Sequence, residues 1–252
     1  MGKEADVVKK LNWLLLILFS AAAVFFRISS LRSDFDGAGL PVGGKASLAL
    51  PLMLIVAAVA FALLARSFPV QRDLSGSIGE YFDFAEALPV TLCVLGAFAL
   101  IAGAALNVIS SQRTALAVLL AVFQLAAGAS VIYTLFVLRR GKAPVGVVLL
   151  TPVYALVLRL IFVYRATAVD PVLTHFYVEI LALAALTAAF LECSAFAFRN
   201  GAPRIFAPLA SMAVVLCVCT AAGTRELSPL LFYPGFALIL LGYCAAADFS
   251  RR

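Results

Sequence analysis

Charged residues are scarce in this chain. Asp, Glu, Lys and Arg together make up 13% of its 252 residues, whereas soluble domains carry about 25%. Hydrophobic residues make up 64%, and the mean hydropathy is +1.09. This composition excludes an ordinary soluble domain and predicts an integral membrane protein.

Several residue types are too few or too poorly spaced for common kinds of site. The single histidine, His175, excludes a bis-His haem or a His-rich metal site within one chain. Cys217 and Cys219 are two residues apart, so on a helix they point about 160° from each other and cannot both bind one metal ion. The sequence contains no HExxH, GxSxG or P-loop motif. We therefore predict no metal site, no cofactor and no known catalytic constellation.

The apolar residues are arranged in long runs, with Lys and Arg at the ends of these runs. A net charge of +6 distributed in this way does not predict a nucleic-acid partner. The runs are about 17 to 25 residues long, which is the length of a membrane-spanning helix. We predict a single all-α integral membrane domain over 1–252, a bundle of about eight transmembrane helices with short loops in a lipid bilayer. The predicted spans are 11–29, 47–65, 88–110, 115–138, 144–165, 172–198, 205–223 and 229–247.

The distribution of Lys and Arg also predicts the orientation of the chain. Counting residues at the ends of spans, the two terminal segments and the even-numbered loops carry 12 Lys and Arg, and the odd-numbered loops carry 6. The positive-inside rule therefore places both termini on the cytoplasmic side of a cell membrane. The short loops are typical of small bacterial plasma-membrane proteins. A signal peptide is an alternative for the first span, since Lys9 and Lys10 precede it. The apolar run continues through Phe26, which favours a retained helix.

A faint internal repeat relates the two halves of the sequence. Phe26-Arg27 resembles Tyr164-Arg165, and Arg139-Arg140 closes the fourth predicted span as Arg251-Arg252 closes the eighth. Duplication of a four-helix unit would produce two parallel halves, as in some transporters. Chance similarity in a sequence rich in Ala and Leu is the alternative.

Two opposite charges lie inside the fifth and sixth predicted spans. Arg159 is 11 residues before Asp170, at the predicted turn, and Glu179 is nine residues after it, so both lie about 14 to 16 Å along their helices. In an antiparallel hairpin the two charges are level, and pairing lowers the cost of placing them at membrane depth. The pair predicts either a structural contact that fixes the hairpin or a site for a small polar or anionic solute.

Other polar residues are candidates for the same site. His175 precedes Glu179 by four residues and shares its helical face, where it could support proton coupling; an interfacial polar role is the alternative. Tyr154, Gln124 and Glu192 are secondary candidates. Glu192 points about 140° away from Glu179, and Gln124 is also explained by a hydrogen bond between helices.

Three functions are compatible with these residues. We favour a small-solute transporter, or a subunit of one, with its polar site at Arg159 and Glu179. The alternative is a non-transporting membrane sensor or accessory subunit that binds a partner subunit. A third hypothesis is an intramembrane lipid-modifying enzyme that depends on Glu179 or Glu192. A fully buried Arg159 with no space beside it would argue against transport, because a solute site needs room as well as charge.

Overall fold

The computed structural model describes residues 2–33, 46–67, 78–110, 115–167, 173–198, 200–224 and 227–247. Within these ranges the regular structure is helical, apart from an isolated bridge between Phe82 and Ala247. The elements are α1 (Gly2–Ser33), α2 (Ala46–Ala65), α3 (Ile78–Tyr81), α4 (Ala87–Ser110), α5 (Ala115–Arg139), α6 (Gly146–Leu149), α7 (Thr151–Thr167), α8 (Leu173–Ala195), the 3-10 helix η1 (Phe196–Phe198), α9 (Pro203–Gly223) and α10 (Leu227–Ala246).

Eight segments of the described residues are long and apolar enough to cross a membrane. They are Val7–Arg32, Leu48–Ala65, Ala87–Ile109, Ala115–Arg139, Gly146–Arg165, Tyr177–Phe198, Pro203–Gly223 and Leu227–Ala246. Each of them overlaps one of the spans predicted from the sequence. The prediction of an all-α membrane bundle with about eight spans is therefore confirmed.

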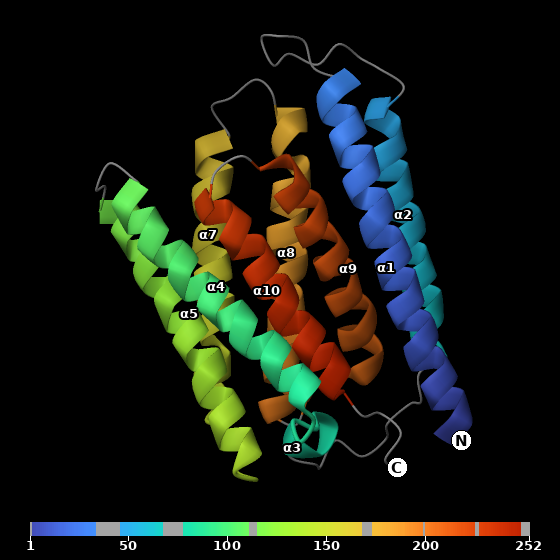
Figure 1. Ribbon diagram of the computed structural model, residues 1–252, viewed down its shortest axis with the longest axis vertical. Coiled ribbons are helices and arrows are strands. Elements are labelled where there is room, and N and C mark those ends of the chain that lie inside the picture. Colours follow the sequence, from blue (N-terminus) through green and yellow to red (C-terminus); the bar gives the residue numbers. More distant parts are fainter. Residues whose placement is uncertain are drawn as a thin grey trace.

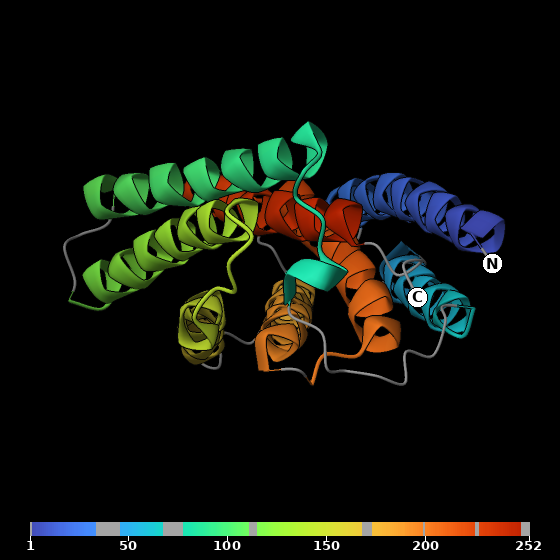
Figure 2. The ribbon, with the colours of Figure 1, turned by 90° about the horizontal axis from the view of Figure 1, so that it is seen from below.

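Six helices form a closed ring in which each contacts the next. The order is α4, α5, α7, α8, α9 and α10, and α10 returns to α4. The α1–α2 pair packs against α9 on one side of this ring (Figure 1). Viewed from one end, α10 lies between α4 and α9 near the middle of the bundle (Figure 2). One large cluster of buried apolar side chains runs through the ring and the α1–α2 pair, and a small second one joins Leu64 of α2 to Ala207 of α9.

The contact between α4 and α10 is made close by glycine. A Cβ atom on Gly96 of α4 would lie 2.5 Å from the carbonyl oxygen of Gly235 on α10. Gly242 of α10 leaves the same kind of space for Cys93 and for the carbonyl group of Pro89. Residues without bulky side chains allow helix backbones to approach each other in a membrane, where dispersion contacts hold helices together. This packing holds α10 in the ring.

The fifth span, predicted as one stretch over 144–165, is divided into two helices. α6 ends at Leu149 and α7 begins at Thr151, with Leu150 between them. Pro152 is the cause, because it has no N–H to donate to the carbonyl group of Val148, and its ring crowds that carbonyl. The longer part of the fifth span is therefore α7.

The two ends of the bundle differ in what holds them together. We call the end where α1 begins and α10 ends the terminal end, and the other the distal end (Figure 1). At the terminal end, the backbone N–H of Asp83 donates to the carbonyl oxygen of Ala246 over 2.8 Å. Lys9 Nζ donates to the carbonyl oxygens of Ala245 and Ala247 at 3.0 and 3.1 Å, where the C-terminal end of α10 attracts a cation. These contacts connect the first and last helices of the bundle.

A group of buried rings fills the core at the terminal end. Phe82, which follows α3, makes edge-to-face contacts with three of them at centroid distances of 5.2 to 5.5 Å. Every ring in the group is at most 4% exposed. We call it the terminal aromatic cluster, and its members are Tyr81, Phe82, Phe84, Phe196, Phe206 and Tyr243. Val70, Leu74, Ile78 and Phe82 are spaced four residues apart, which suggests one stripe of an interfacial helix, whereas the Ser and Gly residues between them weaken a helix. Val70 and Leu74 lie outside the described residues, and Ile78 and Phe82 are buried.

Candidate functional site

Arg159 is the middle residue of α7, and its side chain points into the bundle. It lies on the helix face of Leu156 and Val163, which are buried, and nearly opposite to Tyr154, which is exposed. The last residue of α7 is eight residues further on, so Arg159 lies about 12 Å from the distal end of its helix. Its side chain is 15% exposed, so this guanidinium is largely but not fully buried.

Glu179 of α8 is held by a tyrosine of α10. The Tyr233 hydroxyl donates a hydrogen bond to Glu179 Oε1 over 2.5 Å. Tyr233 is fully buried, whereas the Glu179 side chain is 22% exposed. Each residue lies six positions after the first residue of its helix, about 9 Å from the distal end. The two groups are therefore at similar depth in the distal half of the bundle.

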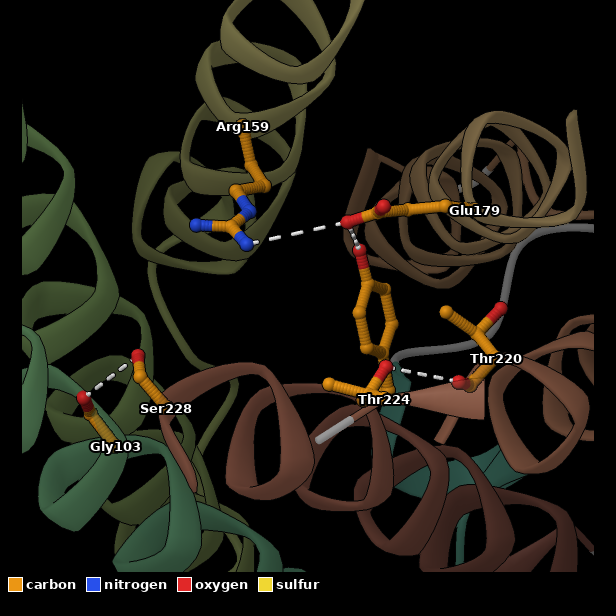
Figure 3. Close-up of polar contacts among 7 residues, drawn as sticks. Gly103, Arg159, Glu179, Thr220, Thr224 and Ser228 are labelled. Carbon is orange, nitrogen blue, oxygen red and sulfur yellow. Dashed lines mark hydrogen bonds and ion pairs between the residues drawn. The ribbon is translucent and has the colours of Figure 1, made fainter. Parts of the chain in front are cut away.

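The structure brings Arg159 and Glu179 together, but not in a close ion pair. Arg159 Nη2 lies 3.9 Å from Glu179 Oε1, the oxygen that already accepts from Tyr233 (Figure 3). This distance is longer than a hydrogen bond. A charge-assisted hydrogen bond between these groups would measure about 2.7 to 2.9 Å. The two side chains therefore attract each other by charge without a hydrogen bond, and the N–H donors of the guanidinium stay available to another acceptor.

The other described groups around the guanidinium also provide no hydrogen-bond acceptor for its N–H donors. Arg159 Nε is buried and donates no hydrogen bond to any described residue. Its Cζ lies 5.5 Å from the centroid of the Phe232 ring, whose face attracts a cation but offers no oxygen or nitrogen acceptor. An arginine has five N–H donors, and leaving them without acceptors away from water is costly. Within the part of the chain that the structure describes, Arg159 is a cation with unused hydrogen-bonding capacity.

Two hydroxyl groups lie in the same region of the bundle, at the end of α9 and the start of α10. Thr224 Oγ1 donates to the carbonyl oxygen of Thr220 over 2.9 Å, and Ser228 Oγ donates to that of Gly103 over 3.3 Å (Figure 3). Both hydroxyl protons are used in these contacts with the backbone. Their oxygens keep lone pairs that can accept hydrogen bonds from a bound solute.

Two of the secondary candidates have structural partners. Gln124 of α5 is buried, and its Nε2 donates to the carbonyl oxygen of Leu100 on α4 over 2.9 Å. Glu192 Oε1 accepts a hydrogen bond from the backbone N–H of Ala202, the residue that precedes α9, over 2.5 Å. Gln124 therefore joins two neighbouring helices, and Glu192 stabilises the connection between α8 and α9.

Tyr154 points away from the pair, and the side chain of His175 is not among those that the structure describes. Tyr154 is on the outer face of α7 and is 52% exposed. His175 is in the first turn of α8.

Aromatic side chains separate the charged pair from the terminal end. Phe232 packs on Phe236 at a centroid distance of 4.9 Å, and Phe236 packs on Phe190 of α8 at 5.3 Å. The terminal aromatic cluster follows further along the bundle. The charged pair Arg159–Glu179 is thus closer to the distal end of the bundle, and aromatic rings lie between it and the terminal end.

No protein-family model matches the chain, and neither a curated protein nor a solved structure is significantly similar to it. The described residues contain no cluster of three or more His, Cys, Asp or Glu side chains that could hold a metal ion. A cation with open donors beside a carboxylate can bind a solute that carries an anionic group.

Sequence reasoning missed the two residues of α10 that complete the site. Tyr233 and Phe232 are adjacent in sequence and contact Glu179 and Arg159, respectively. Both are aromatic residues in an apolar span, where aromatic residues are common, and nothing nearby in the sequence distinguishes them. Their role becomes visible when α10 is placed against the α7–α8 hairpin.

Proposed function

We propose that this protein is a small-solute transporter, or a subunit of one, that binds an anionic group of its solute at Arg159. The observation that supports the proposal is the guanidinium of Arg159, which lies inside a membrane bundle with a buried Nε that donates no hydrogen bond to a described residue. Ionisable residues inside membrane spans are costly, and they commonly mark solute or ion pathways.

The geometry of the pair favours a binding role over a purely structural one. A structural ion pair gains most when arginine and carboxylate form two parallel hydrogen bonds, which offset the cost of removing both charges from water. Here the closest approach is 3.9 Å, and Tyr233 occupies the facing oxygen. The side chains of Arg159 and Glu179 are 15% and 22% exposed, so the pair is not the fully buried one that would argue against transport.

The position of the site gives the direction of access. The pair is closer to the distal end, and aromatic rings lie between it and the terminal end. If both termini are cytoplasmic, as the distribution of Lys and Arg predicts, the solute enters from outside the cell. Transport then requires the terminal aromatic cluster to separate during the cycle.

A sensor or accessory subunit is the second candidate, and the terminal end supplies the observation that favours it. Lys9, Asp83 and the terminal aromatic cluster together hold α1, α3, η1, α9 and α10 at that end. A protein in which this end never opened would bind the same solute without moving it. The two candidates therefore differ in transport and not in binding.

The first experiment identifies the solute and tests its dependence on Arg159. The full chain is extracted gently from its own membrane, and native mass spectrometry searches for mass beyond the 26.6 kDa polypeptide. We expect a bound small molecule in the natural chain that is lost in Arg159→Met. Arg165→Met is the matched control, because Arg165 is on the same helix but is exposed.

The two candidates are then separated with the recovered compound. A labelled form exchanges across liposomes that contain a transporter, and it binds without exchange to a sensor. Retention of the same compound by Arg159→Met, or no retained compound in any sample, would contradict the proposal that Arg159 binds a solute.

A further inference from the structure

We infer that the solute held by Arg159 and Glu179 is a small zwitterion whose carboxylate and ammonium groups are on neighbouring atoms, as in an α-amino acid. This inference rests on the proposed function, because it names the class of solute for the same site. Three properties of the pair lead to it: its charge balance, the atoms that it leaves unused and the distance between its charges.

The first property is that the two side chains of the pair have no net charge together. Arg159 and Glu179 carry opposite charges, and Glu179 forms no ion pair with another described cation. A simple carboxylate bound at Arg159 would leave one net negative charge at a depth where an uncompensated charge is costly. A zwitterion adds one charge of each sign, so the occupied site stays neutral.

The second property is the set of unused polar atoms. The contacts of Tyr233 and Arg159 with Glu179 are both made at Oε1, which leaves Oε2 to accept from an ammonium group. The guanidinium of Arg159 offers donors for a carboxylate, in the planar arrangement that carboxylates match. Tyr233 is a neutral donor, so it orients Glu179 without cancelling the negative charge. The site therefore presents one free donor group and one free acceptor group of opposite charge.

The third property is distance. The charged groups of the pair approach within 3.9 Å of each other. An α-amino acid carries its carboxylate and ammonium groups on one carbon, so each can contact its partner at the same time. A zwitterion with widely separated charges would reach only one side of the pair.

The test uses three matched sets of compounds, each with an amino acid, the corresponding acid without the amino group and the corresponding amine without the carboxylate. The sets are alanine, propionate and ethylamine; leucine, isocaproate and isoamylamine; and phenylalanine, hydrocinnamate and phenethylamine. Binding to the purified full chain is measured at neutral pH by equilibrium dialysis, with thermal stabilisation as a second readout.

We expect at least one amino acid to bind about 30-fold or more tightly than its matched acid and amine, because each of those leaves one charge of the site without a partner. In Glu179→Gln the preference should reverse in favour of the acid, because the site then carries a net positive charge. An acid that binds the natural chain as tightly as its amino acid overturns the inference. So does a Glu179→Gln variant that folds and keeps the original preference.

The remaining outcomes separate this inference from the proposed function. If acids alone bind, and their binding requires Arg159, the proposed function stands and the zwitterion is wrong. If no compound of the panel binds, the solute recovered by gentle extraction decides, according to whether it carries both charges. If extraction also recovers no solute that depends on Arg159, both proposals fail. Should Glu179→Gln not fold, the comparison within each set on the natural chain is sufficient.

Discussion

Replacing Glu179 by glutamine should destabilise the bundle by removing the counter-charge of Arg159. The substitution keeps an oxygen that can accept the hydrogen bond of Tyr233, so the loss is mainly electrostatic. At 3.9 Å and an effective dielectric constant of about 20, the attraction amounts to about 4 kcal/mol. Both side chains keep some exposure, 15% and 22%, so we expect about half of that, a loss of about 2 kcal/mol.

The double variant Arg159→Met with Glu179→Gln should be more stable than Glu179→Gln alone. It removes both charges and replaces the cation by an apolar side chain of similar length, so no charge is left without a partner. We expect it to lie within about 1 kcal/mol of the natural chain. Unfolding in mixed micelles of increasing sodium dodecyl sulfate, followed by far-ultraviolet circular dichroism, measures each free energy.

The four proteins of this cycle, including Arg159→Met alone, give the coupling energy between the two side chains. A coupling below about 0.5 kcal/mol would mean that the two sites behave independently. That result would refute the electrostatic account of the pair and with it the charge-balance argument for a zwitterion.

Three further predictions concern the contacts around the site and the packing of α10. Tyr233→Phe removes the hydrogen bond to Glu179 and should cost about 1.5 to 3 kcal/mol in the same unfolding assay, with weaker retention of the bound solute. An unchanged free energy would mean that this hydroxyl does not hold the carboxylate. Gly96→Val places a Cβ 2.5 Å from a carbonyl oxygen of α10, so we expect a loss of more than about 1 kcal/mol, whereas Ala102→Val on the exposed side of α4 should be close to neutral. Equal effects of the two valines would contradict the close packing. Lys9→Met removes the donors at the end of α10 and should cost about 1 to 2 kcal/mol; faster hydrogen exchange in the last turn of α10 is the accompanying signal, and unaltered exchange would argue against this contact.

The membrane bundle could be predicted because its signal is local. Each span is a continuous apolar run whose length matches the bilayer, and the ends are marked by charged or turn residues. The depth of Arg159 and Glu179 could be predicted for the same reason, because it follows from the number of residues between each of them and the turn that joins their helices. Helices joined by a short connection are antiparallel neighbours, so the sequence alone suggests that these side chains come close.

The rest of the site depends on packing between helices that are distant in sequence. Tyr233 reaches Glu179 from a helix 54 positions further along the chain, and no periodicity in α10 indicates that contact. Asn12 and Ser211 provide a second example: they exchange hydrogen bonds of 3.1 and 3.2 Å between α1 and α9, and the sequence analysis did not select either. Such pairs follow from the order of helices in the ring, which hydropathy does not encode.

The internal repeat has a limited structural counterpart. Arg27 is 6% exposed beside α9, where Gly223 leaves room for its guanidinium, whereas Arg165, its counterpart in the second half, is exposed. Arg27 and Arg165, which form one of the matches that suggested the repeat, therefore lie in different surroundings. Duplication of a four-helix unit stays a hypothesis, because chance also explains the few residues that match between the two halves.

The position of α10 has a consequence for how the bundle is made. Helices enter the membrane in the order of synthesis, and α10 follows all the other spans of the described chain. It occupies the place between α4 and α9, against the glycine face of α4, so those two helices cannot reach their final contacts while α10 is still being synthesised. Until then, the carboxylate of Glu179 has no phenol to hold it, and Lys9 has no α10 carbonyl groups to bind. Closure of the ring, completion of the proposed solute site and the contact between the first and last helices must therefore be late events in biogenesis. A ribosome stalled before α10 would leave an open arc of α4, α5, α7, α8 and α9 in the bilayer.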